Sequence, residues 1–169
     1  MKKILMILSL VAISEMALAQ HEAGDKNLNV GLGLGSTFAS GSTTIPPLGA
    51  SFEIGIKDEI SVGGYLGYSA SELKSGGFTA KYSYTIIGVR GSYHYDLLGD
   101  PKIDTYGGLM LGYNVAGVDW DGPGNAASAG GVSYSLYVGG RYAFSDKVGA
   151  FAELGYGIAY LQLGANVKF

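Results

Sequence analysis

The segment at residues 160–169, YLQLGANVKF, alternates between apolar and other side chains over its whole length. Its apolar set is Leu161, Leu163, Ala165, Val167 and Phe169. Successive side chains in a β-strand point to opposite sides, so strict alternation predicts a strand with one apolar face. The segment therefore predicts a strand that separates two different environments.

The same alternation recurs through the rest of the chain. Seven earlier segments show it, at residues 28–35, 48–57, 60–68, 87–95, 103–115, 132–144 and 148–156. No segment has the apolar spacing of an amphipathic helix. Eight amphipathic strands of about ten residues predict an all-β fold, namely an eight-stranded antiparallel up-and-down barrel.

Composition indicates which face of this barrel points outward. Charged residues make up only 15% of the chain, hydrophobic residues 47%, and 29 residues are glycine. The second face of each segment is mostly Gly, Ser and Asn, which suits the inside of a narrow barrel better than a surface facing water. A closed barrel also leaves no unpaired strand edge in lipid. The sequence therefore predicts a transmembrane β-barrel with its apolar face toward lipid.

The N-terminus carries a targeting pattern. Lys2 and Lys3 precede an apolar run at residues 4–13, and Ala-Leu-Ala at 17–19 fits a small-residue cleavage site. A membrane-anchoring helix would need about 20 apolar residues, more than this run provides. We therefore expect a cleaved signal peptide over residues 1–19 and a barrel domain over residues 20–169.

Aromatic residues cluster at two levels of the predicted apolar face. One level holds Tyr68, Tyr113, Tyr134 and Tyr156, and the other holds Tyr93, Tyr95, Tyr142, Phe144 and Phe169. Two such girdles are typical of outer-membrane barrels, as are short periplasmic turns and longer outer loops. The short connections lie at residues 57–59, 96–102 and 145–147, and the longer ones at 38–46, 69–81 and 116–131.

With these features, the chain resembles the small eight-stranded outer-membrane proteins and is similar to the OmpX family and the transmembrane domain of OmpA. The resemblance implies a place in the outer membrane of a Gram-negative-type bacterium, with outer-membrane lipids as partners. It also implies that the last strand is recognised by the outer-membrane assembly machinery. The residues of this C-terminal signal would be Leu161, Leu163, Ala165, Val167 and Phe169.

Four charged residues fall on the inward face at similar depths. They are Glu53, Arg90, Arg141 and Glu153, here named the lumen network. A turn at residues 145–147 would make Arg141 and Glu153 diagonal neighbours, within reach of a forked ion pair. The network could fill the lumen as a satisfied set of salt bridges, or it could form a polar gate for ions. Eight strands leave room for side chains rather than for an open channel, which favours the first interpretation.

Other functions have weaker signals in this sequence. Ser92 and His94 share the inward face, whereas lipid-modifying barrels act on their outer surface. His21 lies near the expected mature N-terminus and is expected to be disordered. The glycines at residues 31–35 follow strand alternation rather than a dinucleotide loop. The acids at residues 119–121 offer too few oxygens for calcium. No catalytic residue, cofactor or metal is predicted.

These observations predict a structural or surface-interaction role in the cell envelope, with outer loops that meet surface partners. The net charge of −3 argues against nucleic acid as a partner. The absence of cysteine excludes disulfides and thiolate chemistry. A narrow pore for ions or small solutes and a lipid-modifying enzyme are the alternatives.

Overall fold

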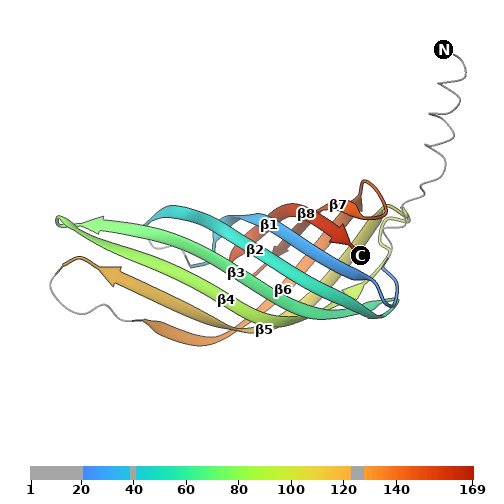
Figure 1. The fold of residues 1–169 in the computed structure, drawn as a ribbon, viewed down its shortest axis with the longest axis horizontal. Coiled ribbons are helices and arrows are strands. Elements are labelled where there is room, and N and C mark those ends of the chain that lie inside the picture. The colour runs from blue at the N-terminus through green and yellow to red at the C-terminus, as the bar shows by residue number, and fades with distance from the viewer. Residues whose placement is uncertain (1–20, 39–40, 123–127) are drawn as a thin grey trace, which may run out of the picture.

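The computed structural model describes residues 21–38, 41–122 and 128–169, so the predicted signal peptide lies outside the described residues. Eight strands follow one another around a barrel (Figure 1). They are β1 (Lys26–Ser36), β2 (Ser42–Lys57), β3 (Ile60–Ser75), β4 (Phe78–His94), β5 (Ile103–Trp120), β6 (Ala129–Ala143), β7 (Val148–Gly155) and β8 (Ala159–Lys168). Within the described ranges, no helix is long and apolar enough to cross a membrane.

Antiparallel pairing of neighbouring strands closes the barrel. Each strand pairs with the next, and β1 pairs with β8 to complete the circle. Alternation then sorts side chains as predicted: Val89 is 66% exposed on the outside, while its neighbour Arg90 is 4% exposed inside. The prediction of an eight-stranded antiparallel barrel, with apolar residues outside and small or polar residues inside, is confirmed.

The two aromatic girdles are present on the outer surface. Tyr134 and Tyr156 stand exposed toward one end of the barrel, and Tyr93 and Phe144 toward the other. We call the second end the turn end, because the short connections 58–59, 95–102 and 144–147 lie there with the end of β8 (Figure 1). The opposite end is called the protruding end.

The outer connections differ from the sequence expectation, since much of their length is strand. β3 continues to Ser75 and β4 begins at Phe78, so the expected loop at residues 69–81 is a hairpin. Its tip is Gly76-Gly77, and both glycines have positive φ, at 61° and 86°. Glycine pairs fit two-residue hairpin turns because they adopt positive φ without strain. The Gly76-Gly77 dipeptide is the sequence feature from which a tight turn, and hence the longer strands, could have been predicted.

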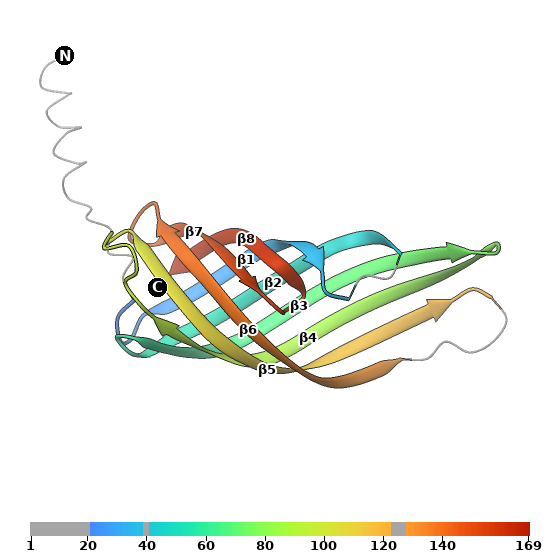
Figure 2. The same cartoon turned by 180° about the vertical axis from the view of Figure 1, so that it is seen from behind.

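Strand lengths are unequal as a result, and the barrel is taller on one side. β2 to β6 run to 15–18 residues, whereas β7 has 8 and β8 has 10. Figure 2 shows β5 and β6 extending well past the ends of β7 and β8. The protruding end is therefore an open sheet that rises above the closed part of the barrel.

Candidate functional site in the lumen

The four side chains of the lumen network all point into the barrel. Glu53 of β2, Arg90 of β4 and Arg141 of β6 are each less than 5% exposed, and Glu153 of β7 is 9% exposed. They occupy alternate positions on strands whose other face meets lipid, which is why all four turn inward. Hydrogen bonds and ion pairs join them into one connected group.

Glu53 is the centre of this group. Its Oε1 lies 3.1 Å from Arg90 Nε and 3.2 Å from Arg141 Nη2. Its Oε2 accepts hydrogen bonds from Ser61 Oγ at 2.8 Å and Ser92 Oγ at 2.7 Å. Glu53 thus accepts three hydrogen bonds and pairs with the Arg90 guanidinium, which satisfies most of its capacity without water.

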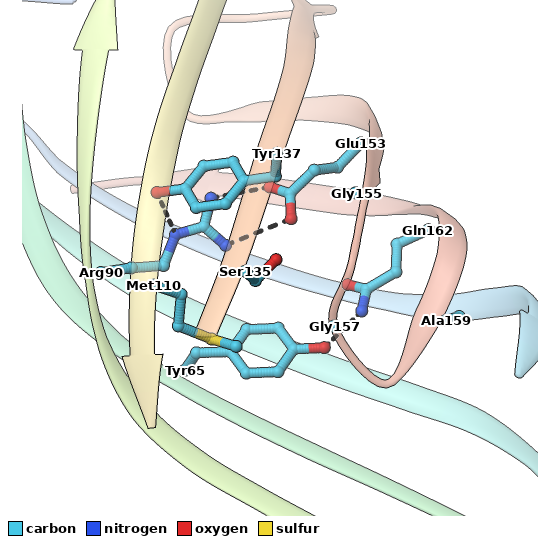
Figure 3. Close-up of a pocket in the computed structure, with 10 residues that line it drawn as sticks. All are labelled: Tyr65, Arg90, Met110, Ser135, Tyr137, Glu153, Gly155, Gly157, Ala159 and Gln162. Carbon is cyan, nitrogen blue, oxygen red and sulfur yellow. Dashed lines mark hydrogen bonds and ion pairs between the residues drawn. The ribbon is translucent and has the colours of Figure 1, made fainter. Parts of the chain in front are cut away.

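Arg90 forms the forked pair with Glu153. Its Nη2 lies 2.7 Å from Glu153 Oε2, and its Nη1 donates to Oε1 at 3.4 Å. The guanidinium carbon also lies 3.8 Å from the centre of the Tyr137 ring. Figure 3 shows Arg90 held between Tyr137 and Glu153. Tyr106 donates a further hydrogen bond to Glu153 at 3.2 Å.

Arg141 does not pair with Glu153, contrary to the sequence expectation. The strand register is the expected one, with Arg141 opposite Phe151. The guanidinium instead donates to Asp104 Oδ2 at 2.7 Å and to Glu53 Oε1 at 3.2 Å. Asp104 lies directly across from Arg141 on β5, which is closer than the diagonal Glu153 that Arg90 already engages.

Asp104 is therefore a member of the site that sequence reasoning missed. It is one of the inward-facing residues of the predicted strand at residues 103–115. The alternation of that strand could therefore have identified it as a lumen residue. Two tyrosines of the same site, Tyr106 and Tyr137, are also inward-facing and buried. Their rings cover the two guanidinium groups, with Arg141 lying 4.4 Å from the Tyr106 ring centre.

His94 links Asp104 to a serine. Its Nδ1 lies 2.7 Å from Asp104 Oδ1, and its Nε2 lies 2.9 Å from Ser61 Oγ. The hydroxyl that His94 contacts thus belongs to Ser61 on β3, rather than to Ser92, its neighbour in sequence. An acid, an imidazole and a serine in this order have the connectivity of a hydrolase triad.

The direction of the hydrogen bonds makes this group unsuited to nucleophilic attack. Glu53 Oε2 lies 2.8 Å from Ser61 Oγ and accepts the only hydroxyl proton that Ser61 has, so the hydroxyl is engaged by a buried carboxylate. Asp104 Oδ1 accepts on the other side of the His94 ring. Ser61 is also only 1% exposed, so a substrate has no access to its hydroxyl.

Acidic and basic groups face one another across the site. The carboxylates of Glu53, Asp104 and Glu153 face the guanidinium groups of Arg90 and Arg141, and the His94 ring hydrogen-bonds to Asp104. Buried charges are costly unless they are paired and hydrogen-bonded. The lumen network, together with Asp104 and His94, meets both conditions with its own side chains.

His21 is ordered, contrary to the sequence expectation. Its ring stacks on the His94 ring, with centroids 3.8 Å apart and planes inclined by 11°. The His21 side chain is buried, with 8% of the residue exposed. No pattern in the sequence indicates this contact, because it depends on how residues 21–25 cross the turn end.

An apolar plug lies above the network, toward the protruding end. Ile86 and Ile158 are fully buried there and pack with Tyr65 and Met110. Ile158 belongs to the β7–β8 connection, which folds into the barrel (Figure 3 shows the adjoining Gly157 and Ala159). Cavities beside the plug and near the turn end have volumes of about 10 Å³ and about 20 Å³. Each has room for about one water molecule.

The remaining sequence candidates lie on the outside. The predicted C-terminal signal forms the outer face of β8, with Leu163 45% exposed and Phe169 69% exposed. Asp119 and Trp120 end β5, and Asp121 accepts a hydrogen bond from the backbone of Thr79. In the described part of the chain, no cluster of three or more His, Asp or Glu side chains could hold a metal ion.

Solved structures of other barrels resemble this one in fold. Ail, the attachment invasion locus protein of Yersinia pestis, is 13% identical with a TM-score of 0.58, and the match covers 87% of this chain and 99% of Ail. OprG from Pseudomonas aeruginosa is 14% identical with a TM-score of 0.57, covering 88% and 97%. Neisserial surface protein A is 17% identical with a TM-score of 0.53, covering 86% and 95%. No curated protein sequence matches the chain.

A closed, inside-out barrel with two aromatic girdles and a filled lumen defines a small outer-membrane β-barrel protein. The model of the outer membrane protein beta-barrel domain family matches residues 5–169, and the chain belongs to this family. The protein therefore lies in the outer membrane of a Gram-negative bacterium. Short turns face the periplasm in such barrels, so the protruding end faces outward.

Proposed function

We propose that this barrel is a surface-interaction protein whose β6 edge binds extended segments of other proteins outside the cell. The observation that carries this proposal is the loss of the β7 partner along the upper part of β6. Pairing with β7 begins at Tyr137, opposite Gly155. Among the described residues, positions 129–135 of β6 pair only with β5.

The backbone groups of this free edge can be identified. The carbonyl of Leu136 accepts a hydrogen bond from the Tyr156 N–H at 3.2 Å, so Leu136 directs its backbone groups toward β7. Backbone groups alternate sides along a strand, so those of Gly130, Val132 and Tyr134 also point away from β5. These groups form a template to which an added strand could pair.

The composition of the edge supports the same role. Residues 129–135 read AGGVSYS, with neither proline nor charge to prevent strand addition. The opposite edge of the protruding sheet, on β2, carries Pro46 and Pro47 and has irregular register near Ile45. Proline lacks the backbone donor and blocks pairing, so the β2 edge is protected while the β6 edge is open.

Charge at the protruding end favours a neutral, backbone-mediated contact. Ail has been solved in complex with the heparin analogue sucrose octasulfate. Here the protruding strands and the start of the β5–β6 connection carry Lys74 and Lys81 against Glu72, Asp119 and Asp121. This balance is slightly negative and would repel a polyanion. An uncharged extended peptide fits the edge better.

Replacing Val132 with proline should weaken peptide binding about tenfold, because it deletes one outward N–H donor of the edge. The probe is a set of linear peptides selected from a random library against the barrel in lipid nanodiscs. Val132→Thr is the matched control, since it changes the side chain and keeps the donor. Equal binding by both variants would contradict the proposal.

The filled lumen argues against the alternative of a pore. The plug and the ion-paired network fill the lumen between the two ends, and the cavities beside them, lined by described residues, are water-sized. We therefore expect the protein to give no stepwise current in planar lipid bilayers. A reproducible, ion-selective conductance step would support the pore and oppose the proposed role.

We also propose that the protein has no catalytic role. His94 is hydrogen-bonded on both sides, and Ser61 is closed off from substrate. Incubation with lipid A or phospholipid should therefore leave the acyl chains unchanged, as read by mass spectrometry.

A further inference from the structure

Residues 21–25, here named the strap, continue the barrel wall at the turn end. The Gly24 N–H donates to the Gly55 carbonyl at 2.9 Å, and the Gly55 N–H donates to the Asp25 carbonyl at 2.8 Å. The Ala23 N–H donates to Asp58 Oδ1 at 3.1 Å. These bonds hold the strap against β2 and carry His21 onto His94 of β4.

His21 is buried without hydrogen bonds of its own. Neither ring nitrogen has a partner, although the residue is only 8% exposed. The ring fits because Gly55 has no side chain: a Cβ there would lie 2.8 Å from His21 Cε1 and 2.4 Å from the Glu22 carbonyl oxygen. A buried, unpartnered imidazole tolerates the neutral state far better than the charged one.

The groups around His21 also favour its neutral state. The His94 ring faces it at stacking distance, while Asp104 and Asp25 are the nearby acids. Both acids are already paired, Asp104 with Arg141 and Asp25 with Lys168. The pKa of His21 is lowered, first by burial and next by the electrostatic effect of His94, and the two acids and the backbone of Ile60 offset this only in part.

We propose that the strap is an acid-released lid over the periplasmic mouth of the lumen, with His21 as its trigger. Docked, the strap covers the His94 and Asp104 side of the network. Once His21 takes up a proton, a buried charge without a hydrogen-bond partner lies against the His94 ring, and the strap detaches.

The direction of the pH effect follows from linkage. The released strap binds a proton at the ordinary imidazole pKa of about 6.5, whereas the docked strap binds it only at lower pH. Docking is therefore fully favourable above about pH 6.5 and weakens as the pH falls below it. Each unit of difference between the two pKa values makes release about tenfold more favourable in acid.

A spin label on the strap tests this proposal. The chain has no cysteine, so Ala23→Cys gives a single attachment site for a nitroxide. In the barrel reconstituted into lipid vesicles, we expect an immobilised spectrum at about pH 7.5 and a mobile one at about pH 5. The global fold should stay intact at both, as judged by an unchanged heat-induced shift in gel mobility.

Two variants test whether protonation of His21, rather than another effect of acid, releases the strap. His21→Phe keeps an aromatic ring on His94 but cannot be protonated, so its strap should stay immobilised at both pH values. Gly55→Ala should release the strap at both, because the added Cβ collides with Glu22 and His21. An immobile strap at about pH 5, or acid release that persists in His21→Phe, would overturn the proposal.

Discussion

Replacing Arg141 with methionine should lower the free energy of unfolding by about 3–5 kcal/mol, the usual cost of breaking a buried ion pair. Arg141 is 4% exposed and donates to Asp104, Glu53 and Asn29. Methionine fills a similar volume without charge. The loss of stability therefore measures the cost of leaving the acceptors of Arg141 unpaired rather than the cost of a cavity. Urea unfolding in detergent micelles measures the effect.

The control is Lys57→Met, which removes a positive charge from the exposed end of β2. Surface substitutions of this kind usually change stability by less than about 0.5 kcal/mol. If the two variants unfold at the same urea concentration, the network does not hold the barrel together in the way its geometry indicates.

A double variant tests whether the unpaired carboxylate of Asp104 causes the loss of stability in Arg141→Met. Asp104→Asn removes the carboxylate that Arg141→Met leaves without its guanidinium. Residues that share an ion pair give non-additive changes, so the double variant should recover at least about 1 kcal/mol relative to the sum of the single changes. Strict additivity would instead place the loss at Glu53, where Arg90 remains as a partner.

The barrel was predictable because its signal is local and repeated. Alternation places Val89 outside and Arg90 inside whatever the rest of the chain does, since the period of a strand is two residues. The inward positions of all four lumen-network residues follow from the same rule. The Gly76-Gly77 turn is equally local, and it explains why β3 and β4 extend beyond the girdle.

The partners inside the lumen were not predictable in the same way. Whether Arg141 reaches Glu153 or Asp104 depends on how the closed barrel places side chains across its interior, and alternation says nothing about that. His94 has Ser92 two positions away, yet it bonds to Ser61 on another strand. The contact of His21 with His94 joins residues 73 positions apart through a segment without alternation.

Replacing Gly164 with valine should destabilise the barrel by about 3 kcal/mol or more, because it overpacks the seam where the circle closes. Gly164 of β8 pairs with Gly31 of β1. A Cβ on Gly164 would lie 2.1 Å from the Val30 carbonyl oxygen and 2.8 Å from the Phe151 ring. A ring can rotate away, but a backbone oxygen cannot move without breaking the β1–β8 pairing.

Gly131→Val is the matched control, since it makes the same change at a glycine of β6 with nothing within 4 Å of the added Cβ. We expect this variant to unfold close to the wild-type urea concentration and Gly164→Val to unfold well below it. Wild-type stability in Gly164→Val would mean that the seam can open enough to admit a side chain. The glycine pair would then not determine how tightly β1 and β8 close the barrel.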